Sequence, residues 1–293
     1  MDNDNIVNLS DAEKTLVVEK KATCPFIAGA VNTDLLPVRN NAKDPLAAIE
    51  DVRKLGNTGG GDLGDLLKHF ATGNHAFMRG DDGRLSKEVP DDLFSLDFPG
   101  SQGSHPGHSG ILQGDPTVLE SGRLSMPDFN RLIKRAQNGL IKRSDFGHFI
   151  AENLKNDPNS RTIGQNTVEL VIDVIDGALD TFASVGLGVM EYLFGDDERD
   201  DTHRLIEKNI TGLAAKNNLV GSAGEFGLLF AFLANSPRSK TIDGELALSV
   251  EDLTEMFVNK RLPVGWEAWE KSWKDWIKHT TGLIISTELA YRT

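Results

Sequence analysis

Apolar residues recur every three or four positions through most of this chain of 293 residues. Leu63, Leu66, Leu67 and Phe70 show the pattern, because that spacing places all four side chains on one face of a helix. Runs that alternate apolar and polar residues, as half-buried strands do, are few. The helical period predicts an all-α fold organised as one large helical domain, since each amphipathic helix must bury its apolar face against another.

Helix start and stop signals divide the chain into predicted helices. One is expected to begin with Asp44 as its N-cap and Pro45 in its first turn, and another is capped by Ser125. Ser249 and Asp252 resemble a capping box at the start of a late helix. The predicted helices span residues 45–56, 63–78, 126–137, 144–157, 202–216, 222–234, 249–259 and 266–278, with one or two buried helices within 168–194 and loops over 24–41 and 79–114.

Four tryptophans near the end of the chain are spaced as they would be on one helical face. They are Trp266, Trp269, Trp273 and Trp276, at intervals of three, four and three residues. The spacing predicts a stripe that packs the last helix on the core. A channel wall or an interface is the alternative, because an exposed row of aromatic side chains is unusual.

The N-terminal sequence and the net charge predict the domain division, the compartment and the partners that the protein does not bind. Residues 1–22 are polar and are predicted to form a peripheral arm, which leaves residues 23–293 as the helical domain. The acidic start has no apolar run, so we expect a cytoplasmic protein, or a secreted one whose leader was removed. The formal net charge of −13 disfavours binding to nucleic acid and to anionic membranes. Residues 168–194 are the most apolar stretch, but the carboxylates within it predict buried helices rather than a membrane span.

Cys24 is the only cysteine, so the fold cannot use an internal disulfide or a cysteine-rich metal site. It begins the predicted loop that precedes the helix expected over residues 45–56, and Pro25 stiffens the backbone there. A thiolate held in this way is a suitable axial ligand for iron, because it pushes electron density onto the metal and favours cleavage of an O–O bond. A small buried apolar side chain is the alternative for a lone cysteine.

Two segments of the chain resemble one protein family. Thr23-Cys24-Pro25, then Asn32, then residues 36–41 (Leu-Pro-Val-Arg-Asn-Asn) resemble the N-terminal signature of the heme-thiolate peroxidases. This family includes the fungal chloroperoxidases and the unspecific peroxygenases. Late in the chain, Gly224-Glu225 before an apolar run, followed by residues 261–263 (Arg-Leu-Pro), is similar to the family's distal segment. The resemblance covers about half of the chain.

The resemblance implies a fold like that of chloroperoxidase, with heme b between the cysteine loop and a distal helix. Cys24 is then the axial ligand of the heme iron, with Pro25 beside it, and Phe226 also borders the heme. Glu225 is the distal acid–base group, and its apolar neighbours predict a raised pKa. The implied activity is that of a peroxidase or peroxygenase, which uses hydrogen peroxide to oxidise an apolar or aromatic organic substrate.

Two further features of the family have altered counterparts here. The family binds a divalent cation, magnesium or manganese, beside a heme propionate through an acidic triplet and a serine. The corresponding residues are Gln113 and Asp115, with Thr117 at the serine position, and the neutral Gln113 is a weaker cation ligand than glutamate. Peroxygenases also carry an arginine seven residues before the distal glutamate, and Asn218 stands at that position before Glu225.

These altered positions leave alternative functions open. A helical binding or scaffold protein could keep the same fold without peroxide chemistry. A heme-dependent dehydratase or isomerase would keep the cofactor and dispense with peroxide. Substitution of Cys24 and Glu225 separates these functions, because only a peroxide-dependent enzyme needs both side chains for turnover.

Overall fold

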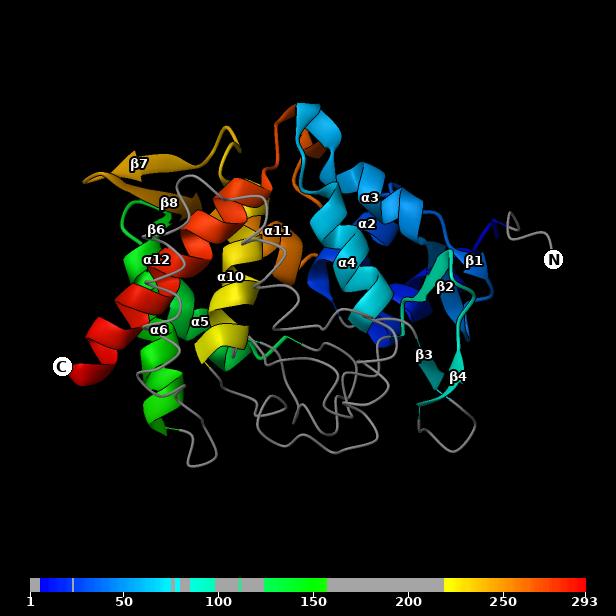
Figure 1. The fold of residues 1–293 in the computed structure, drawn as a ribbon, viewed down its shortest axis with the longest axis horizontal. Helices are drawn as coiled ribbons and strands as arrows, with labels where there is room; N and C mark the ends of the chain where they lie inside the picture. The colour runs from blue at the N-terminus through cyan, green and yellow to red at the C-terminus, as the bar shows by residue number, and fades with distance from the viewer. Residues whose placement is uncertain are drawn as a thin grey trace.

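The computed structural model describes residues 6–22, 24–74, 77–79, 85–97, 111, 124–156 and 219–293. These ranges are mostly helical and also contain three small antiparallel sheets (Figure 1). The prediction of a mainly helical protein is therefore confirmed, and the stricter prediction of an all-α fold is wrong. The predicted helices within 168–194 and over 202–216 lie outside the described residues.

Nine α-helices and three shorter helical turns fall within the described ranges. The α-helices are α1 (Asp11–Leu16), α2 (Pro25–Asn32), α3 (Ile49–Gly56), α4 (Gly64–Asn74), α5 (Met126–Ile133), α6 (Arg143–Asn156), α10 (Leu219–Leu233), α11 (Val250–Phe257) and α12 (Trp273–Arg292). The turns are η1 (Val17–Lys21, π-helical), η2 (Thr58–Gly60) and η3 (Trp266–Ala268). No helix in these ranges combines the length and the apolar composition needed to cross a bilayer.

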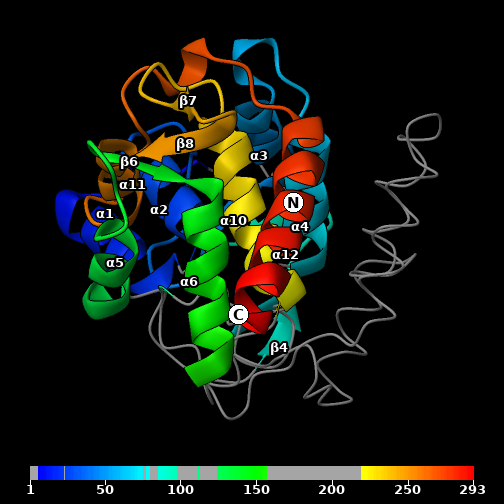
Figure 2. The ribbon, with the colours of Figure 1, turned by 90° about the vertical axis from the view of Figure 1, so that its left-hand side faces the viewer.

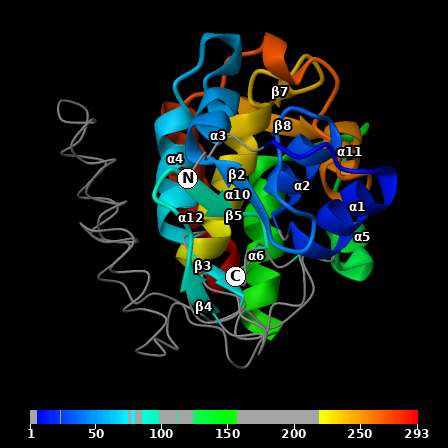
Figure 3. The same cartoon turned by 90° about the vertical axis from the view of Figure 1, so that its right-hand side faces the viewer.

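The three sheets join segments that lie far apart in the sequence. Their strands are β1 (Arg39–Asn40), β2 (Pro45–Ala48) and β5 (Leu93–Ser95) in the first sheet, β3 (Phe77–Arg79) and β4 (Leu85–Glu88) in the second, and β6 (Leu140–Lys142), β8 (Glu245–Ser249) and β7 (Lys240–Ile242) in the third. In the first sheet β2 is central, and this sheet packs beside α3 and α4 (Figure 3). The third sheet joins the start of α6 to the segment before α11.

Helix α10 is the centre of the core, between α6 and α12 on one side and α2 on the other (Figures 1 and 2). On the first side, the ring of Phe146 from α6 meets the edges of Phe226 and Phe230, with centroid distances of 4.9 and 5.1 Å. Gly227 lets α12 approach closely, because a Cβ atom there would overlap the hydroxyl of Thr280. On the opposite side, Phe232 stacks on Phe26 of α2 at 4.4 Å.

The predicted helix start at Asp44 and Pro45 is wrong. Residues Pro45–Ala48 form strand β2, and the helix begins four residues later at Ile49. The strand forms because its backbone groups find partners on both edges, in β1 and in β5. The predicted loop over residues 79–114 is likewise interrupted by β4 and β5 in the described residues. Strands of so few residues show no clear alternation of apolar and polar residues in the sequence. Whether they form therefore depends on hydrogen bonding to strands from distant parts of the chain.

The tryptophan stripe does not lie on one helix, contrary to the prediction. Trp266 is in η3, Trp269 is extended, and α12 begins only at Trp273. Between them Lys271 turns its ammonium group inward, where it donates to the backbone carbonyls of Trp266 and Trp269 and to a hydroxyl of η2. Trp266, Trp269 and Trp276 are nevertheless buried in the core, as the packing interpretation expected.

The late helix α11 begins where the sequence predicted, but without the capping box. Ser249 is its N-cap and accepts a hydrogen bond from the backbone N–H of Glu251. Asp252 is fully buried and instead accepts hydrogen bonds from Ser236 Oγ at 2.6 Å and Arg238 at 3.0 Å. The shorter aspartate side chain therefore ties α11 to the turn after α10.

The N-terminal arm is not peripheral along its whole length. Val17 and Val18 in η1 are buried and belong to the main apolar cluster. The exposed part of the arm is held by an ion pair of 2.7 Å between Lys14 and Asp34. Two apolar side chains among polar neighbours are thus enough to bring the end of this segment into the core.

Candidate functional site

Cys24 occupies the N-cap position of α2, with an extended backbone, and Pro25 is the first residue of the helix. This places the sulfur near the free amide groups of the first turn, those of Phe26 and Ile27. Burial raises the pKa of the Cys24 thiol, and these backbone N–H groups act in the opposite direction. The predicted loop over residues 24–41 is therefore wrong, because Pro25–Asn32 form α2 directly after Cys24.

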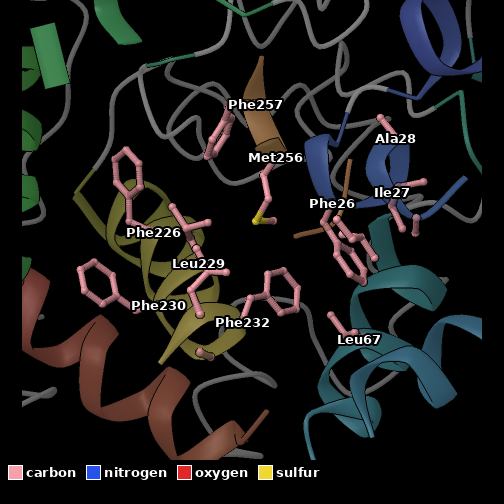
Figure 4. Packing of buried hydrophobic residues seen from close by; sticks show 14 of the residues in the cluster. Phe26, Ile27, Ala28, Leu67, Phe226, Leu229, Phe230, Phe232, Met256 and Phe257 are labelled. Carbon is pink, nitrogen blue, oxygen red and sulfur yellow. The ribbon is translucent and has the colours of Figure 1, made fainter. Parts of the chain in front are cut away.

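Glu225 is the one ionisable side chain in the sequence of α10. It precedes Phe232 by seven residues, which is close to two helical turns, so both residues lie on the same face of α10. Because Phe232 stacks on Phe26 of α2, that face is turned toward the helix that begins at Cys24 (Figure 4). The negative charge of Glu225 is close enough to the sulfur to contribute to the raised pKa of Cys24.

Phe226 does not share this face of α10. Figure 4 shows Phe226 and Phe230 on the side of α10 that is turned away from Phe26. The ring of Phe226 packs edge-on against Phe146 and Phe149 of α6. One residue along a helix rotates the side chain by about 100°, so Phe226 cannot follow Glu225 toward α2. The apolar residues nearer to Glu225 on the helix surface are Leu229 and Phe232, which the sequence interpretation did not single out as site residues.

The remaining predicted site residues are not described. Gln113, Asp115 and Thr117, expected near a cation, and Asn218, expected beside Glu225, all lie outside the described residues. Within the described ranges, no group of three or more His, Cys, Asp or Glu side chains could hold a metal ion. The site is thus built from Cys24 and Glu225, which come from two helices about 200 positions apart in sequence.

The residues around Cys24 fit a heme in their chemistry. A thiolate ligand to iron needs backbone N–H groups near it that stabilise its charge, and the start of α2 places those of Phe26 and Ile27 near the Cys24 sulfur. Glu225, on a separate helix, is close enough for its charge to act on that sulfur. Comparison of the chain with protein-family models, with curated proteins and with solved structures finds no match.

His279 is a buried titratable residue that the sequence interpretation missed. It lies on α12 with 2% exposure, and its ring stacks on Phe230 with centroids 5.1 Å apart. No hydrogen-bond partner reaches its Nδ1 atom from the described residues. Burial, followed by the positive charges of Arg143 and Lys278, lowers the pKa of His279 to about 4. The sequence did offer one signal of its burial. His279 follows Trp276 by three residues, which places both side chains on the same face of a helix.

Lys271 is the second buried basic residue that was missed. It is fully buried, and burial lowers its pKa to about 8 although Glu267 acts in the opposite direction. Its ammonium group lies over the rings of Trp266 and Trp269, at 4.6 and 5.1 Å from their centroids. These contacts join η2 to η3, so the role of Lys271 is to hold two loops together.

Proposed function

We propose that this protein is a heme-thiolate oxidoreductase, in which the Cys24 sulfur would hold the iron of heme b and Glu225 would act as the acid–base group. The observation that carries the proposal is that Cys24 begins α2 while Glu225 lies on the face of α10 whose Phe232 stacks on Phe26 of α2, and the charge of Glu225 also helps to raise the pKa of the Cys24 thiol. The oxidant is hydrogen peroxide, because nothing in the sequence indicates a flavin or a reductase partner. The reaction is that of a peroxidase or a peroxygenase.

Cys24 has the surroundings that a thiolate ligand requires. Its thiol is desolvated and has a raised pKa, so in the absence of a cation it stays protonated and unreactive. Heme supplies an iron that binds peroxide and whose positive charge favours the deprotonated sulfur. The nearby N–H groups of Phe26 and Ile27 would stabilise the negative charge on the sulfur.

Glu225 supplies the proton movement that peroxide cleavage needs. Its carboxylate takes a proton from one oxygen of hydrogen peroxide and returns it to the other, so the departing oxygen leaves as water. Glu225 is the one ionisable residue in the sequence of α10. Leu229 and Phe232 extend the same face and offer an apolar surface to an organic substrate.

Two substitutions test the proposal when the protein is produced with a supply of heme. The wild-type protein should show a Soret band, and its reduced complex with carbon monoxide should absorb at the position typical of a thiolate ligand. Cys24→Ala should lose that position. Glu225→Gln should keep both bands and lose peroxide-dependent turnover by roughly 10²- to 10⁴-fold. Glu251→Gln, which alters an exposed carboxylate on α11, is the matched control and should keep full turnover.

Three results would contradict the proposal. A colourless wild-type protein that ignores added hemin would exclude a heme function. Retention of the thiolate spectrum in Cys24→Ala would assign the axial position to another residue. Unchanged turnover in Glu225→Gln would remove the acid–base role. A wild-type protein that binds heme but does not consume peroxide would instead favour a dehydratase or an isomerase.

A further inference from the structure

Trp276 on α12 makes a hydrogen bond to the residue directly before Glu225. Its buried indole group donates from the N–H to the carbonyl oxygen of Gly224 over 3.1 Å. Helical geometry already gives that carbonyl a partner, the N–H of Leu228 one turn later in α10. The bond from Trp276 is therefore additional to those that the helix itself requires, so its presence needs another cause.

A second tryptophan bonds to α10 for a different reason. The indole N–H of Trp269 donates to the carbonyl oxygen of Phe232 over 2.9 Å. Phe232 lies in the last turn of α10, where carbonyl groups have no partner within the helix. Trp269 thus satisfies a free carbonyl at the helix end, and stability alone explains its bond.

Contacts with α12 at three positions fix the rotation of α10 about its own axis (Figure 2). One is the hydrogen bond at Gly224. The second is at Gly227, where the hydroxyl of Thr280 occupies the place of a missing Cβ atom. The third is the ring of Phe230, which stacks on His279 with centroids 5.1 Å apart. The three positions follow one another at intervals of three residues, so they form one stripe along the helix.

Glu225 is turned away from this stripe by the angle that one residue adds, about 100° from Gly224. That direction is also the direction of Phe232, which stacks on Phe26 of α2. A rotation of α10 by about 20° would move a group at the helix surface by about 2 Å. A displacement of about 1 Å can cost on the order of 100-fold in rate, so a fixed rotation matters to a proton-transfer group.

We propose that Trp276 is a positioning residue for Glu225. Its N–H holds the peptide unit that joins Gly224 to Glu225, and so sets the direction of the carboxylate relative to the start of α2. The inference rests on the proposed function for the reaction in which Glu225 acts. The position of the carboxylate can be tested without heme, because all of these residues belong to the chain itself.

Trp276→Phe removes the indole N–H, and Trp269→Phe is the matched control on the same helix. Each variant loses one hydrogen bond to α10, so both should lower the melting temperature, by about 3–10 °C. In the heme-free protein, the NMR titration of the Glu225 carboxyl carbon, assigned with Glu225→Gln, should move by about half a pH unit or more in Trp276→Phe only. With heme bound, Trp276→Phe should lose peroxide-dependent turnover by about tenfold or more, and Trp269→Phe should keep it.

Benzothienylalanine at position 276 is a second test, because it keeps the shape of the indole and replaces only the N–H by sulfur. It should move the Glu225 titration as Trp276→Phe does, and it leaves no cavity if that variant does not fold. An unchanged titration or unchanged turnover in the folded variants at position 276 would overturn the inference, as would an equal change in Trp269→Phe. Absence of a Soret band would contradict the heme proposal and would leave the NMR result unaffected.

Discussion

Replacing His279 with phenylalanine removes a buried imidazole and keeps an aromatic ring in its place. The imidazole is enclosed by α10 and α12, stacks on Phe230 and lies near the positive charges of Arg143 and Lys278. In the folded protein these surroundings lower the pKa of His279 from its ordinary value of 6.5 to about 4. The unfolded chain therefore binds a proton at a pH where the folded protein does not.

The sign and size of the effect follow from this difference. Above pH 6.5 the imidazole is neutral in both states, so it adds no dependence on pH. As the pH falls from 6.5 toward 4, the unfolded state gains the proton first, and the folded state is destabilised relative to it. The loss for this one residue is about 2 kcal/mol at pH 5 and about 3 kcal/mol once the folded state is also protonated.

Urea unfolding of wild type and His279→Phe, each at about pH 7.5 and about pH 5, measures the effect. Carboxylates contribute equally to both proteins, so the quantity of interest is the difference in acid destabilisation between them. We expect that difference to be about 2 kcal/mol, with the variant less sensitive to acid. His148→Phe, which alters an exposed histidine of α6, is the control and should behave as wild type. Equal acid destabilisation of wild type and His279→Phe would refute the reasoning.

Two further predictions concern buried polar contacts, and both are measured by urea unfolding at neutral pH. Lys271→Met should lower the free energy of unfolding by about 3 kcal/mol, because two backbone carbonyls and a hydroxyl lose their shared donor. A change below about 1 kcal/mol would show that water replaces the ammonium group. Asp252→Ala should cost about 2 kcal/mol, because Ser236 and Arg238 lose a buried acceptor. Asp252→Asn should retain part of that stability, and equal losses in the two variants would contradict the hydrogen-bond explanation.

Local signals in the sequence were sufficient for several helices. The helical period and the polar caps predicted α6, α10 and α11 to within a few residues at most of their ends, because these helices depend on their own apolar faces and first turns. The same signals failed at Pro45, where a proline after an aspartate indicated a helix. There the residues pair with β1 and β5 instead, and no local pattern reports those distant partners.

Some features of the candidate site were also visible in the sequence, and others depend on how the helices pack. Cys24-Pro25 and Glu225 within an apolar run were visible as local features, and the resemblance of both segments to one family connected them. The helix that begins at Pro25 was not predicted, because its residues were interpreted as a loop. The orientation of Phe226 was not visible, because it depends on which face of α10 meets α6 and which meets α2. His279 was missed for the same reason, since its ring partner Phe230 comes from another helix.

The sequence by itself determined several helices, such as α6, α10 and α11, and which residues carry reactive groups, because propensity, capping and side-chain chemistry act over a few neighbouring residues. Only the tertiary structure decided which of those residues meet. Packing of Phe26 on Phe232 turns Glu225 toward the start of α2, and Lys271 breaks the tryptophan stripe by binding carbonyls inside the core. Such contacts join residues that are tens to hundreds of positions apart, so their energy has no counterpart in any local stretch of sequence.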